Sequence, residues 1–213
     1  MRLIGMLDSP YVRRVAISLQ LLGLEFTHEP LSVFRSFEQF RAINPVVKAP
    51  TLVCDDGTVL MDSSLMLEYA EALAAQRGLG SLLPTDLAAR QADLRVIGLA
   101  LAACEKSVQI IYERNLRPPE KQHEPWVERV TGQMLAAFGA LEAEWQRRPL
   151  AEHVAQRSQA GITSAVTWHF TQAMLPQLLP AARHGALAAL SAAAETQPAF
   201  SAARHGGGVC APR

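Results

Sequence analysis

The sequence predicts a two-part fold, in which a small α/β module is followed by an all-helical domain. In the first part, short apolar runs suited to strands alternate with segments whose apolar residues repeat at helical spacing. Beyond residue 86 the chain is rich in alanine and leucine at helical spacing and shows no convincing strand. The length of 213 residues allows one large or two small domains.

The predicted domain boundaries follow changes in composition. We expect an α/β module over residues 1–78, a linker rich in turn formers over 79–86, and a helical domain over 87–203. Residues 204–213 include three consecutive glycines and no periodic pattern, so we expect a mobile tail there.

The elements predicted for the first module are, in order, strand, helix, strand, helix, strand, strand and helix. Pro30 favours an edge position for the second strand, because proline cannot donate a ladder hydrogen bond. Asp56-Gly57 is typical of a tight hairpin between the last two strands. This order favours a parallel pair, then a hairpin, with helices on the faces of the sheet. We expect strands near 2–7, 26–31, 51–53 and 58–61, and helices near 10–22, 36–43 and 65–77.

The second part is predicted to be a bundle of long helices. Arg117-Pro118-Pro119 interrupts the first of them, and Pro176 ends the third. We find no repeat of 20–50 residues that would indicate a solenoid. An all-α bundle follows, with helices near 87–114, 126–148, 162–175 and 181–194.

Composition and charge exclude several classes of partner. Twenty basic residues balance twenty acidic ones, so nothing electrostatic points to a nucleic acid or an anionic membrane. The three cysteines are widely spaced and form no C-x-x-C pair, which argues against a disulfide framework or a zinc cluster. This usage predicts a reducing compartment, the cytoplasm. No signal peptide and no apolar stretch of membrane-spanning length is expected.

One short motif directly follows the first predicted strand: Ser9-Pro10-Tyr11-Val12-Arg13. Proline suits the first turn of a helix, where its missing N–H costs nothing, and this makes Ser9 the N-cap. A hydroxyl beside the positive end of a helix dipole favours an anion, a thiolate included. The alternative is a plain helix cap with no further role.

Three motifs in order carry a resemblance to a known family. The first is Ser9–Arg13, the second is Asn44-Pro45 leading to Lys48-Ala49-Pro50, and the third is Asp62-Ser63. With an α/β module before a helical domain, the chain resembles the glutathione S-transferase family, in a serine-type bacterial form, over nearly its whole length. The resemblance implies a thioredoxin-like first module that binds glutathione as co-substrate, a helical domain that lines the pocket for the other substrate, and no metal.

The resemblance assigns the catalytic role to Ser9, whose hydroxyl would stabilise the thiolate of bound glutathione. Lowering a thiol pKa by about two units requires roughly 2.7 kcal/mol of preference for the anion. A charge-assisted hydrogen bond and the helix dipole can supply this together. Tyr11 is the rival donor, because some family members use a tyrosine near the N-terminus. Its alternative is packing against the second domain.

Four further residues are expected to hold the tripeptide. With a cis bond before Pro50, the backbone of Ala49 would pair with the cysteinyl part of glutathione. Lys48 would reach the glycine carboxylate, unless it is a plain exposed lysine. Asp62 would bind the γ-glutamyl ammonium and Ser63 the γ-glutamyl carboxylate, and both can also serve as helix caps.

The sequence departs from the family pattern at two places. Val47 stands where the family often has glycine, which bears on the shape of the loop before Lys48. In Ser158-Gln159-Ala160-Gly161, glycine replaces the aspartate that would complete a capping box. We therefore expect a less stable start for the following helix, or a different cap such as Thr163.

Some residues have two interpretations each. Tyr112 and Trp168 are candidates for the second-substrate pocket, and the alternative for both is the helical core. Arg13 and Arg14 are expected to be surface or interdomain charges rather than ligand contacts.

The leading hypothesis is a homodimeric glutathione transferase that conjugates glutathione to small apolar electrophiles, a detoxification activity. One alternative is a glutathione-dependent thiol–disulfide reductase or peroxidase, but that chemistry prefers cysteine where Ser9 stands. Another is a non-catalytic binding or regulatory protein with the same fold.

Overall fold

The computed structural model describes residues 1–148 and 157–210. Contacts within the chain define two compact units. The first joins Met1–Leu82 to the C-terminal residues from Glu195 onward, and the second comprises Leu83–Ala194. Below, each unit is described by itself.

The first unit contains a four-stranded sheet in the order β2-β1-β3-β4. The pair β1–β2 is parallel, whereas β3 is antiparallel to both β1 and β4. The predicted parallel pair followed by a hairpin is therefore confirmed, and so is the edge position of β2. The strands are β1 (Arg2–Ile4), β2 (Thr27–Glu29), β3 (Thr51–Val53) and β4 (Val59–Met61).

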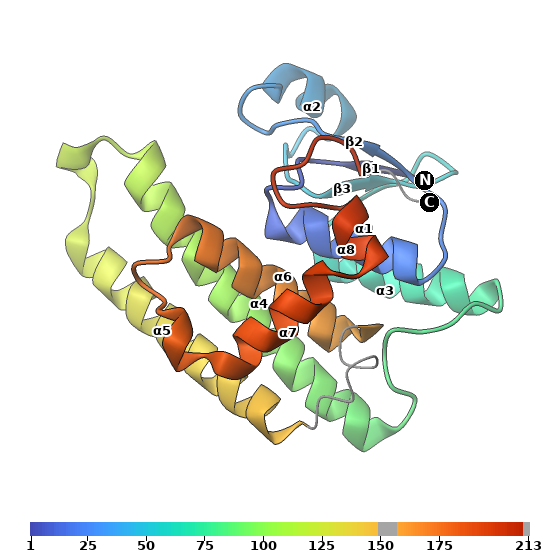
Figure 1. The fold of residues 1–213 in the computed structure, drawn as a ribbon. Helices are drawn as coiled ribbons and strands as arrows, with labels where there is room; N and C mark the ends of the chain where they lie inside the picture. The colour runs from blue at the N-terminus through green and yellow to red at the C-terminus, as the bar shows by residue number, and fades with distance from the viewer. Residues whose placement is uncertain (149–156, 211–213) are drawn as a thin grey trace. The chain divides into compact units, whose positions relative to one another are not determined.

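Helices cover both faces of this sheet. α1 (Pro10–Leu21) and α3 (Ser63–Gln76) lie on one face, and α2 (Phe37–Ile43) lies on the other (Figure 1). Gly23 follows α1 with a φ of 70°, the left-handed conformation that commonly ends a helix. The apolar side of α1 is fully buried against the sheet, as its helical spacing predicts; its core residues are Val12, Val15, Ala16 and Leu19.

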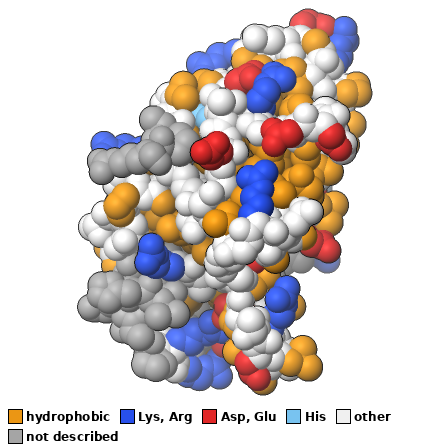
Figure 2. Space-filling view, turned by 90° about the vertical axis from the view of Figure 1, so that its right-hand side faces the viewer, with side chains coloured by type: hydrophobic (Ala, Val, Ile, Leu, Met, Phe, Trp, Pro, Cys, Tyr) orange, Lys and Arg blue, Asp and Glu red, His pale blue; other side chains and the backbone are white. Residues whose placement is uncertain are grey.

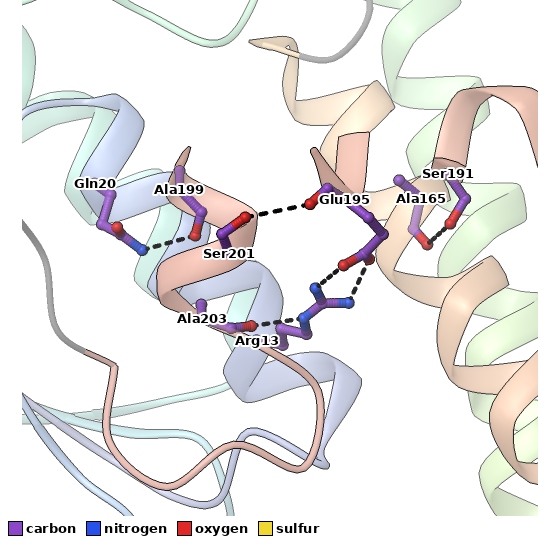
Figure 3. Close-up of polar contacts among 8 residues, drawn as sticks. All are labelled: Arg13, Gln20, Ala165, Ser191, Glu195, Ala199, Ser201 and Ala203. Carbon is purple, nitrogen blue, oxygen red and sulfur yellow. Dashed lines mark hydrogen bonds and ion pairs between the residues drawn. The ribbon is translucent and has the colours of Figure 1, made fainter. Parts of the chain in front are cut away.

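The C-terminal segment, which we define as residues 195–210, packs on the first unit and contains a short helix, α8 (Pro198–Ala202), that the sequence did not predict. Two side chains of α1 hold it (Figure 3). Arg13 donates to both carboxylate oxygens of Glu195, at 2.8 and 2.7 Å, and to the Ala203 carbonyl at 2.7 Å. Gln20 donates to the Ala199 carbonyl at 3.2 Å. These contacts hold residues 195–203, which directly precede the predicted tail.

A buried histidine ties the end of this segment to the sheet. The Nδ1 atom of His28 accepts a hydrogen bond from the Cys210 backbone N–H at 2.9 Å, so its Nε2–H donates to the Gly5 carbonyl at 2.7 Å. Burial lowers the pKa of His28, although the Gly5 carbonyl and the charge of Glu29 act in the opposite direction. This environment favours the neutral imidazole that both hydrogen bonds require.

All the regular elements among the described residues of the second unit are helices, as predicted. Its long helices are α4 (Leu87–Leu116), α5 (Glu124–Arg147), α6 (Gln159–Met174) and α7 (Gly185–Glu195), with 3₁₀ turns at Pro119–Lys121 and Ala181–Arg183. The sequence predicts that the last of these helices begins at residue 181, but α7 begins about one turn later, at Gly185. The buried Glu142 carboxylate accepts the N–H groups of Ala186 and Leu187, which caps α7 at that later point.

At the start of α6 the structure retains the serine cap, and the alternative cap Thr163 is wrong. Ser158 remains the N-cap, and its Oγ accepts the Gly161 N–H at 3.0 Å. Thr163 does not replace it, because its hydroxyl donates to the Gln159 carbonyl within the helix. The serine half of the capping box thus works without the missing aspartate.

Charges of both signs are interspersed among apolar and neutral side chains on the face shown in Figure 2, in keeping with the zero net charge. Of the helices that the structure describes, none combines the length and apolar character needed to span a membrane.

Candidate functional site

The register of the sheet places the predicted site residues at one end of the first unit. Ile4, the last residue of β1, lies opposite Thr51, which in turn lies opposite Met61 at the end of β4. The segments after β1, before β3 and after β4 therefore meet at the same end of the sheet. These three segments carry Ser9, Lys48-Ala49 and Asp62-Ser63.

Ser9 caps α1 as predicted. It has extended backbone angles, and its Oγ accepts the Val12 N–H at a long 3.4 Å. Because the hydroxyl oxygen acts as the acceptor in this bond, its hydrogen stays available to donate to another group. Ser9 is partly exposed, and it stands at the positive end of the helix.

A glycine that sequence reasoning passed over lets the three segments approach each other. Gly5 ends β1 with a φ of 136°, which explains why the strand stops before the predicted residue 7. A Cβ atom at this position would lie 2.6 Å from the Val12 side chain and 3.2 Å from the Ala49 Cβ. Glycine is therefore required where β1, α1 and the loop before β3 come together.

The loop before β3 is built around a buried asparagine. The Asn44 amide donates to Thr51 Oγ1 at 2.8 Å, and its oxygen accepts the Val46 N–H at 3.0 Å. Thr51 in turn donates to the Lys48 carbonyl at 2.7 Å. The Ala49–Pro50 peptide bond is cis, as the resemblance led us to expect. Lys48 itself is exposed and Ala49 is partly exposed.

Val47, at the position where the resemblance leads us to expect glycine, has a backbone conformation that suits glycine. Its φ is 52°, in the left-handed region that β-branched residues rarely occupy. Replacing Val47 by glycine is expected to raise the free energy of unfolding by about 0.5–1 kcal/mol, because the strain removed exceeds the entropy cost of glycine. Chemical denaturation measures this change.

The neighbouring valine provides a matched control for this prediction. Val46 is exposed and has no positive φ, so Val46→Gly should lower the free energy of unfolding by about 0.5–1 kcal/mol. Equal losses from the two glycine variants would contradict strain at Val47.

Asp62 and Ser63 begin α3 and adjoin a buried cation. Asp62 is the N-cap, with a φ of 72°, and its carboxylate accepts the Ser64 N–H at 2.9 Å. Ser63 is buried, and its Oγ accepts a hydrogen bond from Nη1 of Arg14 at 3.0 Å. The same Arg14 nitrogen lies 3.3 Å from the Ser64 hydroxyl. Strained backbone at a non-glycine residue is frequent where a ligand binds.

Arg13 and Arg14 are buried, so the expectation of surface charges is wrong, whereas Arg13 does contact Glu195 and Ala203 from the predicted helical domain 87–203. Their relative exposures are 1% and 3%, and both make their described contacts within the first unit. Arg13 faces the C-terminal segment, whereas Arg14 faces the start of α3. The signal available in the sequence was a pair of arginines inside an otherwise apolar helix, which implies buried partners.

The candidates for a second-substrate pocket belong to different environments. Tyr11 is partly exposed in the first turn of α1. Tyr112 is 47% exposed on α4. Trp168 is only 4% exposed, and its ring packs on Phe138 and His184 in the interior of the helical unit. For Trp168 this environment favours the core interpretation that the sequence left open.

The protein's own thiols are buried, and two of them have raised pKa values. Burial raises the pKa of Cys54, and it raises that of Cys210 to about 11. Both are therefore held as neutral thiols rather than reactive thiolates. Within residues 1–148 and 157–210, no group of three His, Cys, Asp or Glu side chains is placed to hold a metal ion.

Comparisons with known proteins show which proteins this chain is similar to. Residues 3–78 match the family model of the glutathione S-transferase N-terminal domain. A Pseudomonas fluorescens glutathione transferase family member with bound glutathione is 31% identical, with a TM-score of 0.80, and the match covers 95% of this chain and 98% of that one. A Methylobacterium radiotolerans glutathione S-transferase in complex with glutathione sulfonate is 26% identical, with a TM-score of 0.84, over 94% and 92% of the two chains.

Curated relatives match over shorter stretches. A maleylacetoacetate isomerase of Pseudomonas aeruginosa is 29% identical over 133 residues, which are 60% of this chain. The match spans 63% of that isomerase and smaller shares of the other curated relatives, a maize and an Escherichia coli protein. From the domain match, the full-length structural match at 31% identity and the sheet-and-bundle fold together, we conclude that the chain belongs to the glutathione S-transferase family.

Proposed function

We propose that this protein is a glutathione transferase in which Ser9 holds the glutathione sulfur as a thiolate. One observation carries the proposal: the hydroxyls of Ser9 and Ser63 both accept a hydrogen bond from the protein, so each keeps its own hydrogen for an anion. Both stand at helix N-termini at the same end of the sheet. Glutathione carries anionic groups that suit both, a thiolate and a γ-glutamyl carboxylate.

The proposed reaction is attack of the thiolate on a small apolar electrophile. With an aryl chloride, a carbon–sulfur bond forms, the carbon–chlorine bond breaks, chloride leaves, and the proton of the thiol passes to water. Ser9 would donate to the sulfur and lower its pKa, so that more thiolate is present at neutral pH. Ser9 forms no bond to the substrate, because the nucleophile is glutathione.

The remaining site residues would hold the peptide. We propose that the Ala49 backbone pairs with the cysteinyl unit, that Lys48 approaches the glycine carboxylate, and that Asp62 binds the γ-glutamyl ammonium. Tyr11 and Tyr112 stay candidates for the side of the second substrate. We also propose that the protein works as a homodimer in the reducing cytoplasm, in keeping with its three free, buried cysteines.

The test combines a binding titration with an assay of conjugation. Calorimetric titration is expected to detect glutathione binding, and an aryl chloride is expected to be converted to its glutathione conjugate. Reduction of a mixed disulfide or a peroxide without conjugation would favour the reductase alternative. Binding without any turnover would favour a binding module, and the absence of binding would overturn the proposal.

The match to an isomerase supports a second candidate activity. The Pseudomonas aeruginosa relative is named a maleylacetoacetate isomerase. An isomerase returns glutathione unchanged, whereas conjugation consumes one glutathione for each product. Following free thiol during turnover of a cis-unsaturated diketo acid therefore distinguishes the two activities: a constant thiol concentration with product formation indicates isomerisation.

A further inference from the structure

The backbone turn out of β1 is held by a buried histidine of β2. Gly5 is buried, and its N–H still follows the sheet, since it donates to the Glu29 carbonyl at 3.0 Å. The φ of 136° at Gly5 turns the chain, and its carbonyl accepts a hydrogen bond from Nε2 of His28 at 2.7 Å. Leaving a buried carbonyl without a donor is costly, so His28 stabilises this turn.

The segment after this turn carries Ser9. The Gly5 carbonyl and the Met6 N–H belong to one planar peptide unit, so His28 fixes the orientation of that unit. The Met6 carbonyl in turn accepts the Ser9 N–H at 3.1 Å. Two hydrogen bonds and the single residue Met6 thus connect His28 to the backbone of the proposed thiolate donor.

Close packing carries the position of Gly5 to the start of α1. A Cβ atom on Gly5 would lie 2.6 Å from the Val12 side chain and 3.2 Å from the Ala49 Cβ, so the backbone there is in tight contact with both. Val12 belongs to the first turn of α1, and its N–H is the group that Ser9 caps. A shift of Gly5 is therefore transmitted to the helix start that holds Ser9.

The C-terminal segment fixes the ring of His28. The Cys210 N–H donates to Nδ1 at 2.9 Å, so the hydrogen of the neutral ring is on Nε2, the atom that faces the Gly5 carbonyl. His28 is only 6% exposed, and burial lowers its pKa against the opposing charge of Glu29, which favours the neutral ring. The backbone of the C-terminal segment thus sets both the orientation and the tautomer of His28.

We propose that His28 is a positioning residue for Ser9, and that the C-terminal segment enables this role by fixing its ring. His28 acts through Gly5 and the turn that follows it. This inference rests on the proposed function, since it concerns how Ser9 is held toward the glutathione sulfur. The last described residues of the chain are then part of the support of the site.

Two amide variants of His28 each reproduce one ring nitrogen. Asparagine ends near the position of Nδ1 and keeps an acceptor for the Cys210 N–H, whereas glutamine reaches the position of Nε2 and can donate to the Gly5 carbonyl. We expect His28→Asn to raise the pKa of the bound glutathione thiol by about 0.5–1, which lowers kcat/KM by about 2–5-fold near pH 6.5. His28→Gln should stay within about twofold of the wild-type protein. The pH dependence of kcat/KM measures both.

A second pair of variants tests the contribution of the C-terminal segment. Cys210→Pro removes the N–H that orients the ring and should raise the thiol pKa by about 0.3–0.5, whereas Cys210→Ala keeps the N–H and should leave it unchanged. Gln20→Leu is the matched control. It removes contacts with the Ala199 carbonyl and the Cys210 thiol of the same segment but leaves the Cys210 N–H in place, so the thiol pKa should not change.

Nuclear magnetic resonance of the ring nitrogens tests the tautomer directly. In the wild-type protein labelled with ¹⁵N-histidine, we expect His28 to carry its hydrogen on Nε2 and none on Nδ1 at about pH 7. A hydrogen on Nδ1 at this pH would show that the Cys210 N–H does not set the ring, and the inference would be overturned.

The kinetic outcomes separate this inference from the proposed function. An unchanged thiol pKa in folded His28→Asn, or an equal rise in His28→Asn and His28→Gln, makes His28 merely structural and overturns the inference while conjugation stands. If the wild-type protein neither binds nor conjugates glutathione, the proposed function itself fails. Should His28→Asn not fold, Cys210→Pro decides: a raised thiol pKa supports the inference, and an unchanged one overturns it.

Discussion

Replacing Glu195 by alanine is expected to lower the free energy of unfolding by about 3–5 kcal/mol, the cost of leaving a buried charge without its partner. Glu195 receives two hydrogen bonds, at 2.8 and 2.7 Å, from Arg13, whose side chain is 1% exposed (Figure 3). Without the carboxylate, the guanidinium keeps only the Ala203 carbonyl and the face of the Phe200 ring among its described contacts. Denaturation with urea, followed by circular dichroism, measures the change.

Two further variants test the cause of this loss. The double variant Arg13→Met/Glu195→Leu removes both charges, and we expect it to cost less than Glu195→Ala alone, because an apolar pair has no charge to desolvate. Glu29→Ala is the matched control. It breaks the half-exposed pair with Arg2 in the same unit and should cost less than about 1 kcal/mol. A double variant as unstable as the sum of its single changes would contradict the explanation by an uncompensated charge.

This ion pair also shows what a single sequence cannot reveal. Arg13 and Glu195 are 182 positions apart, and no local pattern links them. Helix α8 has only five residues, and it depends on contacts with α1 from the other end of the chain. The prediction of the C-terminal residues therefore rested on their composition alone, and composition says nothing about distant partners.

Features determined by neighbouring residues were predicted well. Ser9 before Pro10 specified the start of α1, and β2 is an edge strand as predicted, although Pro30 itself follows the strand. Asp56-Gly57 likewise indicated the hairpin between β3 and β4. These local signals were sufficient for the order of elements in the first unit.

The site residues that cap helices could be predicted from the sequence. The residues that contact them from distant parts of the chain were missed. Asp62 and Ser63 form a recognisable helix start, and the structure has them at that start. Arg14 reaches Ser63 across 49 positions, and its burial contradicts the usual preference of arginine for the surface. Gly5 is required by the side chains of Val12 and Ala49, which only the folded chain brings near it.

Replacing Ser9 by alanine is expected to raise the pKa of the bound glutathione thiol by about 1–2 units, because the thiolate loses one charge-assisted hydrogen bond. The thiolate is the nucleophile, so the rate rises with pH through this pKa. If the wild-type protein lowers the pKa from about 8.5 to about 6.5, the variant loses about 5–50-fold in kcat/KM near pH 6.5. The loss should shrink as pH increases and nearly vanish above about pH 9, where the thiol ionises without help.

The rival donor provides the decisive control. Tyr11 lies two residues after Ser9 and also carries a hydroxyl, so Tyr11→Phe should leave the apparent pKa unchanged if Ser9 is the donor. Ser9→Thr keeps a hydroxyl and should retain most of the activity. Because Ser9 also caps α1, its loss costs about 0.5–2 kcal/mol of stability, which a melting curve measures separately. Lower activity through partial unfolding would be similar at all pH values, whereas loss of the thiolate donor must appear as a shifted pH profile. If the pH profile of the rate shifts in Tyr11→Phe and does not shift in Ser9→Ala, Tyr11 rather than Ser9 is the catalytic donor.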